Sequence, residues 1–104
     1  MRNDVWDIYA IELMHKNKVN NFYADLILNK VDLYIDYCLY NKRKIRRERI
    51  DLIVNYEIYK FNGFIPKNIP KNNQKIIREF LNLIFPDEKH IYREFLKLSN
   101  KVIK

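Results

Sequence analysis

Glycine is almost absent from the chain, which has a single one, Gly63, among 104 residues. Sheet proteins place residues with positive φ at their tight turns, and glycine is the usual choice there. Asparagine can replace glycine at some of these positions, and the chain has thirteen asparagines. The scarcity of glycine therefore favours a mostly helical fold, and a sheet whose turns use asparagine is the alternative. It also excludes the glycine-rich loops that bind nucleotide phosphates.

Residues that carry common catalytic and metal chemistry are also few. Cys38 is the single cysteine, so the chain can form neither an internal disulfide nor a cysteine metal cluster. Ser99 is the one serine, threonine is absent, and His15 and His90 stand alone without metal-ligand spacing. We therefore expect a protein that is not an enzyme, has no catalytic residues, and needs no metal or cofactor.

One string of residues approaches a catalytic motif. Asp51, Glu57 and Lys60 have the residue types of a metal-dependent nuclease, but three positions rather than two separate the glutamate from the lysine. We interpret the string as chance rather than as a catalytic site.

Long hydrophobic runs are missing as well. No apolar stretch approaches the roughly 20 residues that a membrane-spanning helix needs, and no apolar signal region follows Met1. We expect a cytoplasmic protein. Isoleucine, asparagine, lysine, tyrosine and phenylalanine supply more than half of the residues, and A/T-rich codons encode them. The composition predicts an A/T-rich source, such as a phage, a mobile element or a low-GC bacterium.

Two helices are predicted in the first part of the chain. The first runs from Asp4 to about Lys16, and its apolar residues share one face: Trp6, Tyr9, Ala10 and Leu13. The second covers residues 21–41. Within it residues 31–40 alternate like a strand, but over the longer window the polar residues recur at helical spacing: Asn21, Asp25, Asn29, Asp32 and Asp36.

Residues 44–61 are ambiguous. Their apolar residues alternate as in a strand: Ile50, Leu52, Val54, Tyr56 and Ile58. In a helix, Glu48, Asp51 and Asn55 would instead form a narrow polar strip, and we favour this interpretation. The alternative is an α+β fold, with residues 31–61 forming a hairpin packed on two C-terminal helices.

The last third contains a short repeat, in which residues 76–83 and 91–98 are identical at six of eight positions. Each copy predicts an amphipathic helix, and the pair forms an αα hairpin or a helix-turn-helix. The predicted apolar faces are Ile76, Phe80 and Leu83 in the first copy, and Ile91, Phe95, Leu98 and Val102 in the second. A connector containing Pro66 and Pro70 precedes them at 64–73. The predicted fold is a single all-α domain over 1–104, a compact bundle of four to five helices.

Positive charge is concentrated in residues 42–49, which we call the basic segment. Residues 1–41 carry four basic and six acidic residues, whereas residues 42–104 carry sixteen basic and seven acidic ones. Six of the eight residues of the basic segment are cationic: Lys42, Arg43, Lys44, Arg46, Arg47 and Arg49. Arginine binds oxyanions through two parallel hydrogen bonds, so this segment is a candidate site for backbone phosphates.

A second candidate contact lies in the last predicted helix, where Lys89, Arg93 and Lys97 share one face. In a helix-turn-helix this face would enter a major groove, with Arg93 on guanine and Asn100 on adenine. An ordinary solvated face explains the same pattern and is favoured.

Tyrosines flank the basic segment, at positions 34, 37, 40, 56 and 59. They could stack on bases. Their apolar neighbours favour core positions instead.

These features predict a small nucleic-acid-binding regulatory or accessory protein. One alternative is a phage-type inhibitor of a host nucleic-acid-handling enzyme, in which the acidic residues Asp25, Asp32 and Asp36 mimic phosphates. Another is a homodimeric structural adaptor in which this acidic stripe pairs with the basic segment, which would make the basic segment structural.

Overall fold

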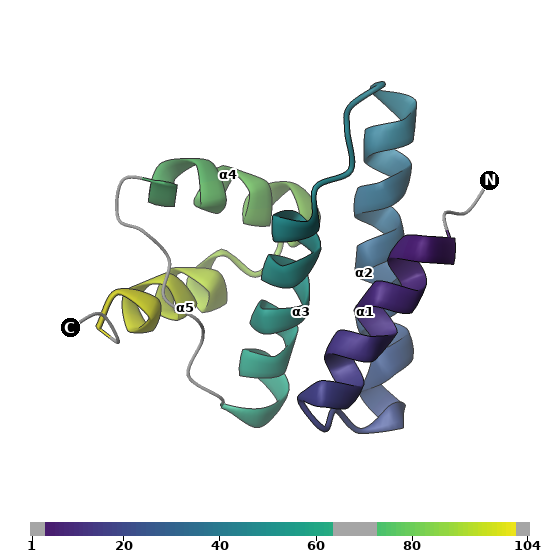
Figure 1. The fold of residues 1–104 in the computed structure, drawn as a ribbon. Coiled ribbons are helices and arrows are strands. Elements are labelled where there is room, and N and C mark those ends of the chain that lie inside the picture. The colour runs from purple at the N-terminus through teal and green to yellow at the C-terminus, as the bar shows by residue number, and fades with distance from the viewer. Residues whose placement is uncertain (1–3, 64–72, 102–104) are drawn as a thin grey trace. The chain divides into compact units, whose positions relative to one another are not determined.

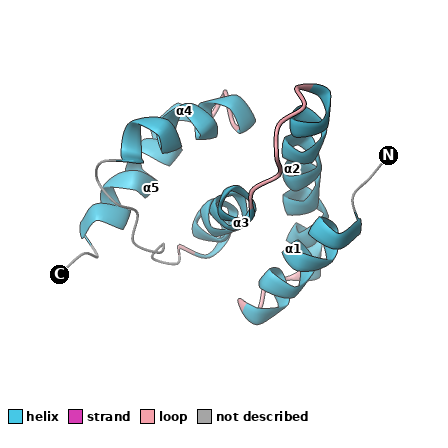
Figure 2. Cartoon of the chain, turned by 45° about the horizontal axis from the view of Figure 1, so that its top comes forward, coloured by secondary structure: helices cyan, strands magenta, loops and turns pink. Residues whose placement is uncertain are grey.

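The described part of the protein is entirely helical. A computed structural model describes residues 4–63 and 73–101, and these contain five helices and no strand (Figure 1). The helices are α1 (Asp4–Lys16), α2 (Asn21–Tyr40), α3 (Arg47–Asn62), α4 (Gln74–Ile84) and α5 (Lys89–Lys101). The prediction of an all-α fold is confirmed. The α+β alternative is wrong, because the residues of its hairpin lie in α2 and α3 (Figure 2).

The chain divides into two compact units, residues 1–54 and 55–104, and the division falls inside α3. The predicted connector at 64–73 lies outside the described residues except for Asn73, which precedes α4. None of the described helices combines the length and apolar character needed to cross a membrane.

The first unit begins with a helical hairpin. α2 runs back alongside α1 (Figure 1). The side chain of Asn20 caps the start of α2 by accepting a hydrogen bond from the backbone N–H of Phe22 at 2.8 Å. Tyr9 of α1 donates a hydrogen bond to Asp51 of α3. Buried residues of the unit come from all three helices and include Ala10, Met14, Ile27, Val31, Ile35 and Ile50.

The second unit is built around aromatic side chains. α5 runs back alongside α4 (Figures 1 and 2). The hydroxyl of Tyr92 donates a hydrogen bond to Oδ1 of Asn82 at 2.9 Å. The ring of Tyr56 lies edge-on to Phe85 and to Phe95, with centroids 4.6 and 5.2 Å apart. Such edge-to-face pairs stabilise a core beyond the area that they bury.

A buried charged group completes this unit. Nζ of Lys60 lies 2.8 Å from Oε1 of Glu57 and 2.8 Å from Oε1 of Glu88, which also accepts a hydrogen bond from Tyr56. Glu57 is buried, and the two carboxylates raise the pKa of Lys60 above its usual value although burial opposes them. The lysine therefore keeps its charge and compensates a carboxylate that would otherwise be costly to bury.

The apolar face of α4 differs from the predicted one. Ile76 and Leu83 are 53% and 45% exposed, whereas Leu81 and Ile84 are buried. Two apolar rows lie next to each other on this short helix, and periodicity does not say which row packs inward. The predicted face of Ile76, Phe80 and Leu83 is therefore wrong for its two end positions.

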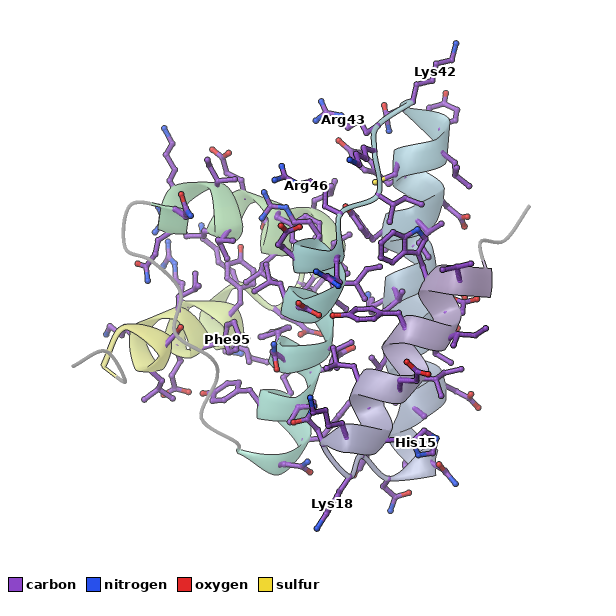
Figure 3. All side chains as sticks on the ribbon, viewed as in Figure 1. His15, Lys18, Lys42, Arg43, Arg46 and Phe95 are labelled. Carbon is purple, nitrogen blue, oxygen red and sulfur yellow. The ribbon has the colours of Figure 1, made fainter. Side chains whose placement is uncertain are left out.

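The ends of α1 and α2 explain how a chain with one glycine turns. Lys18 and Lys42 have φ of 56° and 55°, in the left-handed region that glycine usually occupies after a helix. The N–H of Val19 bonds to the carbonyl of Met14 at 3.0 Å, and the N–H of Arg43 bonds to that of Cys38 at 2.8 Å. Both turns are Schellman motifs, and each has a lysine at its strained position (Figure 3).

Relieving this strain should stabilise the protein. We expect Lys18→Gly to raise the free energy of unfolding by about 0.5–1 kcal/mol, because glycine has no Cβ that disfavours the left-handed conformation. Urea denaturation measures the change. Lys18→Ala is the control, since it removes the same charge but retains a Cβ; an equal gain in both variants would contradict the explanation.

Candidate nucleic-acid interface

The basic segment connects α2 to α3. It starts in the Schellman turn at Lys42, and its last three residues form the first turn of α3. Lys42 extends beyond the end of α2, and Arg43 and Arg46 follow along the connection (Figure 3). All of these residues belong to the first unit.

Two side chains of α2 hold this connection from its inner side. The buried hydroxyl of Tyr34 accepts a hydrogen bond from the backbone N–H of Arg46 at 2.9 Å. The thiol of Cys38, also buried, lies 3.8 Å from the carbonyl oxygen of Lys44, within the range of a weak S–H donor. Burial raises the pKa of Tyr34 to about 12, so its hydroxyl stays protonated at neutral pH. The backbone that carries the cations is therefore fixed at several points.

The cationic side chains point into solvent. Five of the six are exposed and Arg49 is half-buried; the exposed ones are Lys42, Arg43, Lys44, Arg46 and Arg47. Ile45 is the half-buried apolar residue between them. A single half-buried isoleucine among exposed cations explains how so charged a stretch joins two helices without entering the core.

The five exposed cations are not held in ion pairs within the described residues. Asp25 and Asp36 on α2 are exposed and form no salt bridge with a described residue either. The described part of one chain therefore does not contain the intramolecular pairing that would give the exposed cations a structural role.

Helix electrostatics explain only part of the positive charge. Cations just after the C-terminus of α2, such as Lys42, are favourable beside its negative dipole end. Arg46 and Arg47 instead stand at the positive end of α3. The carbonyl of Arg46 accepts the first helical hydrogen bonds, which makes it the N-cap residue, yet arginine has no acceptor with which to cap. These two arginines cost stability where they are.

The second predicted contact lies on α5, in the second unit. Lys89, Arg93 and Lys97 are all exposed and succeed one another every four residues along one face. α5 is the second helix of the hairpin that it forms with α4. The side chain of Asn100, the predicted adenine contact, lies outside the described part of the chain.

The three residues of the nuclease-like string, Asp51, Glu57 and Lys60, do not share one set of partners. Asp51 accepts a hydrogen bond from Tyr9 in the first unit, while Glu57 pairs with Lys60 in the second. Among the described side chains no group of three or more histidine, cysteine, aspartate and glutamate residues could hold a metal ion.

The flanking tyrosines divide into two kinds. Tyr34 and Tyr56 are buried, Tyr37 and Tyr59 are half-buried, and Tyr40 is 88% exposed. The predicted core position is therefore wrong for Tyr40, the last residue of α2. Helical periodicity could have found it, because Tyr40 follows Asp36 by four residues and so lies beside the polar stripe of α2. No sequence signal pointed to Tyr34 and Cys38 as anchors of the basic segment.

Comparison of the chain with models of known protein families, with curated proteins and with solved structures gave no match.

The anchoring role of Tyr34 can be tested directly. We expect Tyr34→Phe to lower the free energy of unfolding by about 1–2 kcal/mol, because the N–H of Arg46 loses its acceptor. Hydrogen exchange of that amide should become faster. Tyr37→Phe, whose hydroxyl forms no hydrogen bond with a described residue, should change stability by less than about 0.5 kcal/mol. Equal losses in both variants would contradict the assigned role.

Proposed function

We propose that this protein binds nucleic acid and that its basic segment holds the phosphate backbone. The observation that carries the proposal is the exposed cluster of Lys42, Arg43, Lys44, Arg46 and Arg47, which has no ion pair with a described residue. Like charges this close repel one another, and a polyanion relieves the repulsion. The net charge of +7 supports the same class of partner.

The arginines at the start of α3 support the proposal separately. Arg46 and Arg47 destabilise the helix that they begin, and residues that cost stability are typical of functional sites. Each guanidinium can bind a phosphate through two hydrogen bonds. Because Tyr34 fixes the backbone of Arg46, this segment loses less conformational entropy when it binds a phosphate.

The exposed stripe of α5 is a second phosphate contact in this proposal. Lys89, Arg93 and Lys97 give it three cations in a row along one helix face. Its contribution adds to that of the basic segment and is measured separately below.

Salt dependence tests the proposal. If the basic segment neutralises about five phosphates, the logarithm of the binding constant should fall with the logarithm of salt concentration with a slope near −4.5 on duplex DNA. On single strands the slope should be about −3.5. Fluorescence anisotropy with labelled duplex DNA, single-stranded DNA and RNA measures these slopes. Binding that does not respond to salt, or no binding at low salt, would overturn the proposal.

Matched variants locate the contact. The double variant Arg43→Gln, Arg46→Ser should reduce the steepness of the duplex slope by about 2 units. Serine at position 46 can cap α3, so the variant should also be more stable by about 1 kcal/mol, which separates lost binding from unfolding. Lys75→Gln, Arg78→Gln removes two exposed cations of α4 and is the control. Arg93→Gln, Lys97→Gln measures the α5 stripe.

A second candidate function is binding to a basic surface of another protein. Three apolar side chains on the outer face of α2 are exposed, at 76%, 48% and 46%: Phe22, Leu26 and Leu33. Asp25 and Asp36 lie beside them and form no salt bridge with a described residue. An apolar strip flanked by carboxylates complements a strip flanked by lysine or arginine. Such cations line the channels of nucleic-acid-handling enzymes, as the inhibitor hypothesis requires.

The double variant Leu26→Ser, Leu33→Ser tests this candidate. Proteins that the original chain captures from a host extract, and that the variant does not capture, would be purified. Each would then be mixed separately with the original chain and with the variant. A reconstituted complex should weaken at least tenfold with the variant and should also weaken with salt. Leu83→Ser on α4 is the control, with a similarly exposed leucine. If neither the double variant nor Leu83→Ser weakens the complex, the apolar strip of α2 is not the binding surface. Light scattering of the chain alone detects self-association through the same strip.

A further inference from the structure

Tyr40 is the one exposed tyrosine of the chain. All eight tyrosines lie in described helices, and the other seven are buried or half-buried. Five of these seven use their hydroxyl groups in hydrogen bonds to other segments: Tyr9, Tyr34, Tyr56, Tyr59 and Tyr92. Tyr40 makes no hydrogen bond or ring contact with a described residue, and 88% of it is accessible. Its ring does nothing for the packing described above.

Single exposed aromatic residues are common on proteins and need no function by themselves. The position of this one sets it apart. Tyr40 is the last residue of α2, and the basic segment begins two residues later. The Schellman turn fixes Lys42 and Arg43 at the end of the same helix through the carbonyls of Leu39 and Cys38. A free aromatic face and a fixed group of cations thus share one end of the first unit.

The charges around Tyr40 give the arrangement a direction. Asp36, one helical turn earlier, is exposed and negative, so it repels a phosphate on that side of the ring. The cations follow Tyr40 in the chain, in the connection to α3 and in its first turn. These charges favour a nucleic-acid strand whose backbone follows the basic segment and avoids Asp36, so that a base can face the ring.

We propose that Tyr40 is a stacking platform for a base, and that the basic segment consequently binds single-stranded nucleic acid in preference to duplex. The inference rests on the proposed function. In a duplex both faces of a base are covered by its neighbours, whereas an unpaired base offers a π-face to an aromatic side chain. Stacking is tolerant of sequence, so the preference concerns strandedness rather than base identity.

The test separates bases from phosphates. The probes are labelled oligonucleotides of one length: single-stranded DNA, single-stranded RNA, the same DNA with abasic sites throughout, and duplex DNA. The original chain should bind the base-containing single strands about tenfold more tightly than the abasic strand. Tyr40→Ala should lose this advantage and bind both equally, with the same salt slope as the original chain because no phosphate contact is removed.

Two further variants keep the result specific. Tyr40→Phe retains the ring and should keep the advantage. Phe22→Ala removes another exposed aromatic residue, at the opposite end of α2, and should leave the advantage unchanged. Thermal unfolding should be nearly the same for Tyr40→Ala as for the original chain, since the ring packs against no described aromatic residue and little of it is buried.

The outcomes distinguish the two proposals. If no probe binds, the proposed function fails and the stacking role fails with it. If all probes bind with a steep salt slope but the abasic strand binds as well as the others, the stacking role fails and phosphate binding stands. An advantage for bases that Tyr40→Ala abolishes supports both, and the DNA and RNA probes show which strand is preferred.

Discussion

Hydrogen bonds in which tyrosine hydroxyls donate or accept hold the described segments of each unit in register with one another. Tyr9 bonds to α3 from α1, and Tyr34 bonds to the start of α3 from α2. In the second unit Tyr56, Tyr59 and Tyr92 bond to Glu88, Glu94 and Asn82. Apolar packing is non-directional, whereas each of these bonds requires one pairing of residues. A core that consists largely of isoleucine, leucine and aromatic rings thereby acquires a defined arrangement within each unit.

The same interaction determines which tyrosines are available for anything else. A tyrosine whose hydroxyl is bonded and whose ring is buried has no face to offer a ligand. Tyr40 has neither a hydroxyl bonded to a described residue nor a buried ring, because it is the last residue of α2 and lies on the side away from the buried residues. The candidate interface therefore combines one tyrosine that is an anchor, Tyr34, with one that is free, six residues apart on the same helix.

Helix positions could be predicted from the sequence because the polar stripes are long. Asn21 to Asp36 keep their helical spacing over many turns, and this outweighed a short strand-like alternation. The inward row of α4 could not be predicted, since Ile76 and Leu81 fit helical faces equally well until a neighbour is placed. The partners of Lys60 were also hidden: Glu57 is three residues away, but Glu88 comes from a distant segment. For the site, the sequence showed the cations of the basic segment but not the anchors that fix it.

Lysine occupies the left-handed position after α1 and after α2, and it places a positive charge at each of these helix ends. Lysine codons begin with two adenines and glycine codons with two guanines, so a genome poor in G and C supplies the first far more readily. Where such a genome ends a helix with lysine in place of glycine, every turn of this kind gains a positive charge beside the helix's exposed carbonyls. Base composition thus makes a protein more cationic when lysine replaces glycine at the left-handed position after its helices. The same lysines then contribute positive charge to a surface that binds a polyanion.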